Sequence, residues 1–272
     1  ILSTAVMSSN ISTADFFPLT ILYQEKLYSV GKIPGGFIKR EGRPSDSATL
    51  TARVIDRPIR PMFDENFRNE VQVVNTVLSV DNDYSPEMTA LFGSSLSLGI
   101  SSIPFDGPVS GVKVGKIDGK LVINPTVEEM ERSTIDLTVA GTINAINMVE
   151  SGSKEVSEEE MLEALMFGHE YIKELCMIQK DIIEEVGKEK IEVELAKLDE
   201  NIVEEVENLI KSDMIEAIQI KDKLEKYAKI DEVKEKALTL YEENHSENID
   251  LENELKQVKK IADMIEANEV RR

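Results

Sequence analysis

The most chemically informative part of the sequence is a basic segment at residues 31–60. It carries seven basic side chains and three acidic ones, in a chain of 272 residues whose formal net charge is −21. An anionic ligand responds to the local field and not to the total charge, so this segment indicates an anion-binding surface. The seven cations are Lys32, Lys39, Arg40, Arg43, Arg53, Arg57 and Arg60.

Residues 31–44 are expected to form a loop, because four glycines and two prolines interrupt any regular element there. Phe37 follows two glycines in this loop and precedes Lys39, Arg40 and Arg43. An aromatic ring beside several cations suits single-stranded nucleic acid, since a base can stack on the ring while the cations contact phosphates. The alternative is a hairpin tip with solvated charges and with Phe37 in the core.

Arg53, Arg57 and Arg60 follow at spacings of four and three, so one continuous helix would present them on one face. Pro58 is expected to end the regular helix, which makes Arg53 and Arg57 the firmer pair. Three neighbouring guanidinium groups repel one another, and phosphate is a natural partner because a guanidinium holds it with two hydrogen bonds. The alternative is an Arg–Asp network with Asp56 that braces the domain.

No catalytic or metal-binding constellation stands out. His169-Glu170 begins like a zinc-protease motif, but position 173 is a lysine, so we expect His169 to be structural. The single cysteine, Cys176, excludes an intramolecular disulfide and fits a reducing cytoplasm. The apolar runs are too short for a membrane span, which excludes a transmembrane role.

The first half of the sequence alternates strand and helix patterns, which predicts an α+β domain at residues 1–150. Asp118-Gly119 is a strong two-residue hairpin signal between two of the strands. Strands are expected at residues 1–7, 16–23, 70–80, 109–117, 120–123, 135–142 and 145–149, and helices at 46–57, 86–101 and 126–132.

Residues 151–272 form a second, all-helical region with 18 basic and 34 acidic side chains. Ser157 and Glu160 fit the capping box that starts a helix, and Gly187 is expected to end that helix. Further amphipathic segments are predicted at 201–211, 213–228, 230–243 and 250–267.

Two stretches identify a relationship: residues 15–63, which include GGFIKREGRPSDSATLTARVIDRPIRPMF, and residues 136–170, DLTVAGTINAINMVESGSKEVSEEEMLEALMFGHE. They resemble the first RNase PH-like half of the polynucleotide phosphorylase family, and the resemblance continues in order over nearly the whole chain. It implies an RNase PH-like mixed sheet with packed helices (ribosomal protein S5 domain 2-like), followed by an all-α domain.

The resemblance also implies an activity. Members of the family degrade RNA from the 3′ end, use inorganic phosphate to release nucleoside diphosphates, and act in mRNA degradation as ring-shaped homotrimers. The family's catalytic carboxylates and its Mg²⁺ site belong to a second RNase PH-like domain, which this sequence lacks. We therefore expect no catalytic and no metal-binding residue in this chain, and no phosphorolysis by it alone. Proteins of an RNA-degradation complex are further expected partners.

Within the resemblance, Phe37, Ile38, Lys39 and Arg40 correspond to an aromatic-aromatic-basic-basic loop that grips single-stranded RNA at the ring entrance. Ile38 replaces an aromatic residue, so one stacking surface is lost. Arg53, Arg57 and Arg60 correspond to a segment associated with RNA passage and an anion pocket. Two alternatives are a stand-alone, non-catalytic RNA-binding or scaffolding protein, and an acidic helical adaptor whose β domain is only a support.

Overall fold

The computed structural model describes residues 1–272 except 13, 15, 197, 249 and 272. The chain divides into two compact units, Ile1–Leu195 and Ala196–Arg272. The division falls later than the expected boundary at 150/151. The reason is that the long helix α4 (Glu158–Val186) packs on the strands of the first unit and belongs to it.

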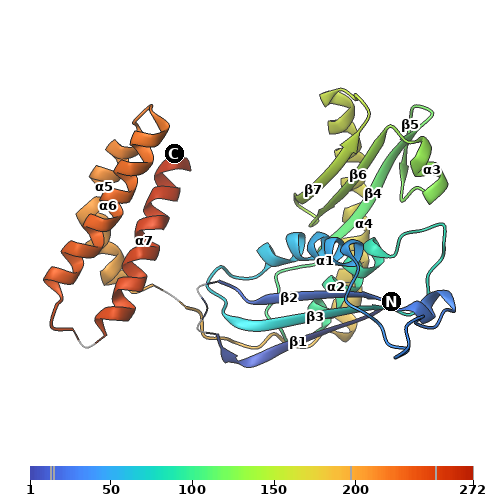
Figure 1. Ribbon diagram of the computed structural model, residues 1–272, viewed down its shortest axis with the longest axis horizontal. Coiled ribbons are helices and arrows are strands. Elements are labelled where there is room, and N and C mark those ends of the chain that lie inside the picture. The colour runs from blue at the N-terminus through green and yellow to red at the C-terminus, as the bar shows by residue number, and fades with distance from the viewer. Residues whose placement is uncertain (13, 15, 197, 249, 272) are drawn as a thin grey trace. The chain divides into compact units, whose positions relative to one another are not determined.

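A three-stranded sheet in the order β1-β3-β2 forms one part of the first unit (Figure 1). The middle strand, β3 (Asn69–Val77), runs antiparallel to β1 (Leu2–Ile11) and parallel to β2 (Leu19–Glu25). Helices α1 (Asp46–Ile59) and α2 (Glu87–Ile100) pack on this sheet. Alternate residues of β3 are buried, as expected of a strand that has one face on a core.

A four-stranded antiparallel sheet, in the order β5-β4-β6-β7, forms the other part. Its strands are β4 (Ser110–Ile117), β5 (Lys120–Ile123), β6 (Ile135–Gly141) and β7 (Ile146–Ser153), and the short helix α3 (Val127–Arg132) lies between β5 and β6. Asp118 and Gly119 form the predicted hairpin turn, with φ of 48° and 78°. Both values are positive, as a two-residue type I′ turn requires.

Helix α4 covers this second sheet and shows why the expected boundary was too early. Its start is the predicted capping box, in which Ser157 and Glu160 cap each other, and Gly187 follows its end. A Cβ atom on Gly168 would lie 2.6 Å from Val139 Cγ1, so only glycine allows the helix to lie this close to β6. Ile172 and Cys176 continue the same buried face.

The segment after α4 is fastened to α2. The ammonium of Lys190 donates hydrogen bonds to the carbonyl oxygens of three residues at the carboxyl end of that helix, at distances of 2.8–2.9 Å. These carbonyls belong to Leu98, Gly99 and Ser101. Burial lowers the pKa of Lys190, while the partial negative charge of a helix carboxyl end favours its charged form.

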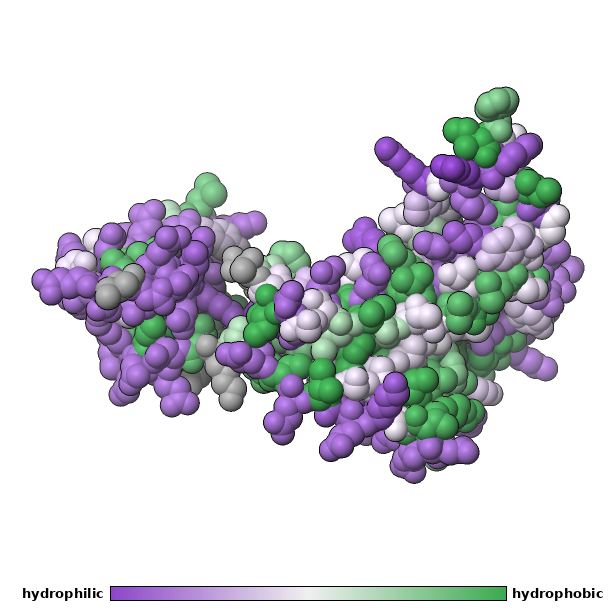
Figure 2. Space-filling model, turned by 90° about the horizontal axis from the view of Figure 1, so that it is seen from below, coloured by the Kyte–Doolittle hydropathy of each residue, from purple (hydrophilic) through white to green (hydrophobic). Residues whose placement is uncertain are grey.

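The second unit contains three helices in its described residues: α5 (Glu200–Ile218), α6 (Lys223–Asn244) and α7 (Leu251–Arg271). The breaks expected near residues 212 and 229 were wrong, because a buried apolar face of α5 runs through the first position and α6 is already helical from Lys223 onward. Ile210 and Met214 flank the first position, and Ile230 and Val233 follow the second. This unit has its own core, and the face of it that Figure 2 shows is largely hydrophilic.

Candidate nucleic-acid interface

The loop at residues 31–45 is almost entirely exposed, and its tip is an aromatic residue. The backbone N–H of Lys39 donates to the carbonyl oxygen of Gly36 over 3.0 Å, which closes a four-residue turn with Phe37 and Ile38 at its corners. The relative exposure of Phe37 is 103% and that of Ile38 is 71%. The alternative that placed Phe37 in the core is therefore wrong.

Three cations follow this tip in the sequence. The side chains of Lys39, Arg40 and Arg43 form no hydrogen bond or ion pair with any residue that the structure describes. Lys39 adopts a left-handed backbone conformation with φ of 55°, which turns the chain sharply after the tip. The loop thus presents one ring and three free charges to solvent.

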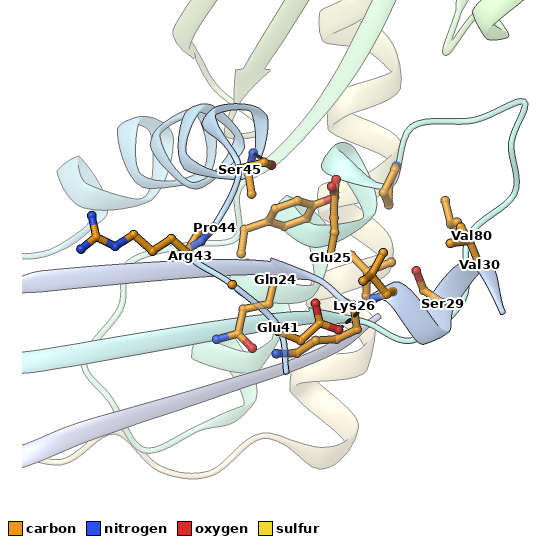
Figure 3. A pocket seen from close by; sticks show the side chains of 16 residues that line it. Gln24, Glu25, Lys26, Ser29, Val30, Glu41, Arg43, Pro44, Ser45 and Val80 are labelled. Carbon is orange, nitrogen blue, oxygen red and sulfur yellow. Dashed lines mark hydrogen bonds between the residues drawn. The ribbon is translucent and has the colours of Figure 1, made fainter. Parts of the chain in front are cut away.

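A pocket of about 540 Å³ lies at the base of the loop (Figure 3). Residues 41–45 form one wall, and the end of β2 with the short 3₁₀ helix η1 (Leu27–Val30) forms another. The backbone N–H of Leu27 donates to a carboxylate oxygen of Glu41 over 3.0 Å and so joins the two walls. The apolar part of the lining includes Leu27, Val30, Ala48, Val77, Val80, Pro44 and Pro86.

The polar groups of this pocket define what it can contact. The hydroxyl of Tyr23 donates to Glu25 over 3.0 Å. Burial raises the pKa of Tyr23 far above its ordinary value, and the charge of Glu25 raises it further, so the phenol stays protonated. Arg43 lines the rim and points away from the cavity, and Gln24 and Glu41 also line it (Figure 3). No pattern in the sequence indicates this pocket, because its walls are brought together by the tertiary fold.

Helix α1 follows the loop directly and carries Arg53 and Arg57, and Arg60 follows its last residue. Ser45 caps it by accepting a hydrogen bond from the N–H of Ala48 over 3.0 Å. Pro58 does not end the helix, contrary to expectation, since α1 continues to Ile59 and leads into the 3₁₀ helix η2 (Arg60–Met62). Pro58 and Ile59 are both buried, and this packing offsets the hydrogen bond that a proline removes.

The three arginines have different surroundings. Arg53 is exposed and has no ion-pair partner in the described part of the chain. Arg57 is exposed and lies 3.0 Å from the carboxylate of Glu150 on β7, in a pair that contributes little to stability because both side chains are more than half exposed. Arg60 forms an ion pair with Asp56 and donates hydrogen bonds to backbone carbonyl oxygens. The alternative of a structural Arg–Asp network therefore applies to Arg60.

His169 and Cys176, whose side chains are of types that catalyse reactions or bind metal ions, lie outside the loop and α1, on helix α4. Among the described residues, histidine, cysteine, aspartate and glutamate do not gather in any group of three or more that could hold a metal ion. His169 is buried against the carbonyl oxygen of Thr142 at 3.0 Å, and burial raises the pKa of Cys176 to about 11. Over the same residues, every helix is too short or too polar to span a membrane.

Three family models match the chain in order. Domain 1 of the 3′ exoribonuclease family covers residues 1–104, and domain 2 of that family covers residues 107–171. The third model, described as the RNA-binding domain of polyribonucleotide nucleotidyltransferase, covers residues 201–272. The chain therefore belongs to the 3′ exoribonuclease family.

Within this family, the chain resembles the polyribonucleotide nucleotidyltransferases, the enzymes also called polynucleotide phosphorylases. It is 59% identical to that of Listeria welshimeri, 56% to that of Enterococcus faecalis and 54% to one from Streptococcus pneumoniae. Each alignment covers 100% of this chain and 37–38% of the relative. The resemblance stated from the sequence is confirmed.

A solved structure supports the fold. Rice Rrp46 superposes with a TM-score of 0.53 at 11% identity, over 66% of this chain and 82% of that one. This similarity concerns the fold alone. Together with the two sheets and their packed helices, it confirms the predicted α+β, RNase PH-like class followed by a helical region.

Proposed function

We propose that this chain is the N-terminal part of a polyribonucleotide nucleotidyltransferase that shortens RNA from its 3′ end by transferring the terminal nucleotide to inorganic phosphate. In this proposal the complete enzyme degrades mRNA in the cytoplasm as a ring-shaped homotrimer. The part described here binds single-stranded RNA and guides it, and the chemistry takes place in another domain. The identity to relatives of that name over 100% of the chain supports the proposal.

The observation that carries the RNA-guiding role is the exposed tip of the loop. Leaving a phenylalanine side chain in water forfeits about 1.5–3 kcal/mol of burial free energy. Phe37 has this exposed position beside Lys39 and Arg40, whose charges are free within the described residues. A base stacked on the ring, with its phosphates on the neighbouring cations, uses all three side chains.

The surroundings of the tip extend the same surface. The pocket at the loop base is lined by apolar side chains, with Arg43 on its rim, and so offers a second place for a flat base. Arg53 and Arg57 lie on α1, the helix that begins directly after the loop. An RNA strand held at the tip can thus continue along further guanidinium groups.

Mg²⁺ and inorganic phosphate enter this proposal only as reagents of the complete enzyme. The described residues do not offer a carboxylate cluster that fits a divalent cation. We assign no step of phosphoryl transfer to side chains of this chain.

Replacing Phe37 by alanine in the full chain tests the role of the loop. Binding of a fluorescent oligo(A) is measured by anisotropy at several salt concentrations. We expect roughly tenfold weaker binding or more, because one stacked base contributes about 1–3 kcal/mol. The salt dependence and the midpoint of thermal unfolding should stay the same, since neither a charge nor a core contact is lost.

Phe16→Ala is the matched control, because Phe16 is also exposed, at 68%, and lies outside the loop. It should bind RNA as the unmodified chain does. Unchanged RNA affinity in the Phe37 variant, or an equal loss in both variants, would contradict the proposed role of the loop.

A further inference from the structure

The second unit poses a physical problem, because the model matching it is described as RNA-binding while the unit is strongly acidic. Residues 196–272 contain 21 acidic and 13 basic side chains. Phosphates are repelled by such a surface on average, so any RNA contact requires a local concentration of basic residues.

One end of this unit supplies that concentration. The α5–α6 turn and the end of α7 lie at the same end, as Figure 1 shows. Lys234 of α6 also pairs with Asp263 and Glu266 of α7, which sets the last turns of α7 beside the first turns of α6. We call this end, residues 219–229 and 267–271, the basic tip. It has five basic side chains and three acidic ones.

Two lysines of the basic tip occupy positions that helix stability disfavours. Lys223 and Lys226 are the first and fourth residues of α6, near N–H groups that carry partial positive charge, where acidic residues such as Glu225 of the same turn are preferred. Helix α4, by comparison, has Glu158, Glu159 and Glu160 in its first turn. Side chains that oppose a local stability rule without a compensating contact indicate a functional position.

The carboxylate of Asp222 does not neutralise these lysines by pairing with them. It accepts hydrogen bonds from the backbone N–H groups of Leu224 and Glu225, both at 3.0 Å. The ammonium groups of Lys221, Lys223 and Lys226 have no ion-pair partner among the residues that the structure describes. They are available to an external anion.

An exposed aromatic ring accompanies these cations. Tyr227 is 51% exposed and lies one helical turn after Lys223, and the neighbouring Leu224 is 81% exposed. The described residues offer Tyr227 neither a ring contact nor a hydrogen bond. A ring between cations is the arrangement that stacks a base while the cations contact the adjoining phosphates.

We propose that the basic tip binds single-stranded RNA, with Lys221, Lys223 and Lys226 on the phosphates and Tyr227 stacked on a base. This inference rests on the proposed function and adds a second RNA contact, on the helical unit. The acidic remainder of that unit repels the strand and so confines RNA to the tip.

The test uses the full chain, fluorescent oligo(A) and a series of salt concentrations. In the triple variant Lys221→Gln, Lys223→Gln, Lys226→Gln we expect roughly tenfold weaker binding at low salt. The salt slope, that is, the slope of the logarithm of the binding constant against the logarithm of the salt concentration, should be smaller in magnitude by about 2, because each phosphate contact on a single strand contributes about 0.7. Tyr227→Ala should weaken binding without changing the slope. The triple variant should unfold at an equal or higher temperature, because it removes unfavourable charges from the start of α6.

The matched control carries Lys256→Gln, Lys259→Gln and Lys260→Gln, three exposed lysines of α7 outside the basic tip. It changes net charge equally, and we expect a much smaller effect on binding. Replacing the three tip lysines by arginine should preserve the affinity, which shows that charge is the active property even if the glutamine variant folds poorly.

Three outcomes overturn the proposal. If the tip and control variants weaken binding equally, the lysines act only through net charge. If the tip variants bind as the unmodified chain does while Phe37→Ala fails to bind, RNA contacts the loop and not the basic tip. If the unmodified chain binds no RNA, the proposed function fails together with this inference.

Discussion

Arg60 and Asp56 form a two-point ion pair at the end of α1, with Nε 3.0 Å from Oδ2 and Nη2 2.7 Å from Oδ1. The same guanidinium donates to the carbonyl oxygens of Phe17 at 2.8 Å and Leu19 at 3.2 Å. One side chain thus joins α1 to the start of β2, the strand whose other end borders the loop. This network makes Arg60 a structural residue, whereas Arg53 on α1 has no ion-pair partner among the residues that the structure describes.

The first prediction separates these two arginines by stability. Arg60→Ala should lower the free energy of unfolding by about 1–3 kcal/mol, because it leaves two carbonyls and a carboxylate without their charged donor. Arg53→Ala, the matched control, should change it by less than about 0.5 kcal/mol. Urea unfolding followed by circular dichroism measures both values. Similar losses in the two variants would refute the structural role of Arg60.

The second prediction concerns the exposed arginines of α1. Arg53→Gln with Arg57→Gln should weaken binding to oligo(A) and reduce the salt slope by about 1–1.5, as two phosphate contacts are lost. Stability should hardly change, since the Arg57–Glu150 pair is exposed to solvent. A variant carrying Lys120→Gln and Arg132→Gln, two exposed cations outside the loop and α1, is the control. If the Arg53 and Arg57 variant unfolds at a lower temperature but binds RNA normally while folded, both arginines have a structural role instead.

The third prediction is that this chain alone releases no nucleoside diphosphate from single-stranded RNA in the presence of phosphate and Mg²⁺. In-line transfer to phosphate requires the attacking and leaving oxygens to be held and neutralised together. Chromatography of the nucleotide products is the measurement. Phosphate-dependent release that persists through repurification and disappears on mutating this chain would contradict the prediction.

The fourth prediction concerns independent folding of the second unit. Val206, Ile210 and Met214 on α5 are fully buried in a cluster that draws only on residues of this unit. Residues 196–272 expressed alone should therefore show helical circular dichroism and cooperative thermal unfolding. The longer fragment 155–272 should aggregate more readily, because it exposes the face of α4 that carries Ile172 and Cys176. A random-coil spectrum for the shorter fragment would contradict this view.

The fifth prediction uses Cys176 as a reporter of folding. Burial raises the pKa of its thiol from 9.0 to about 11. Because the Cys176 side chain is fully buried and only the thiolate reacts, alkylation of the folded chain by iodoacetamide should be slow at pH 8. Urea should expose the thiol, restore an ordinary pKa and accelerate alkylation strongly. Fast labelling of the folded chain at pH 8 would show that α4 is not packed on its sheet as described.

The predictions made from sequence succeeded where the cause is local. Ser157 with Glu160, and Asp118 with Gly119, act through neighbours within three residues, so their patterns could be read directly. The exposed cations at Lys39 and Arg40 were found in the same way, because an excess of charge in an exposed loop depends little on the rest of the fold.

The expectations that failed depended on distant parts of the chain. Pro58 remains in a helix because the core buries it, and Arg60 is held by the carbonyls of Phe17 and Leu19, far away in sequence. The domain boundary expected near residue 150 was too early. The apolar pattern of α4 is the same whether the helix packs on other helices or on a sheet, so the pattern alone could not assign α4 to the first unit. Periodicity reports that a face is buried but not what buries it.

The position of β3 in the middle of its sheet has a consequence for synthesis of the chain. Leu2 pairs with Thr76 and Leu19 with Val71, so both outer strands must wait for a strand that is translated after the loop and α1. A nascent chain therefore carries β1 and β2 unpaired, with apolar residues accessible, until β3 emerges from the ribosome. The anchoring of the loop at residues 31–45 is then a late event, and slowing translation between residues 45 and 77 should prolong the interval in which the chain needs a chaperone.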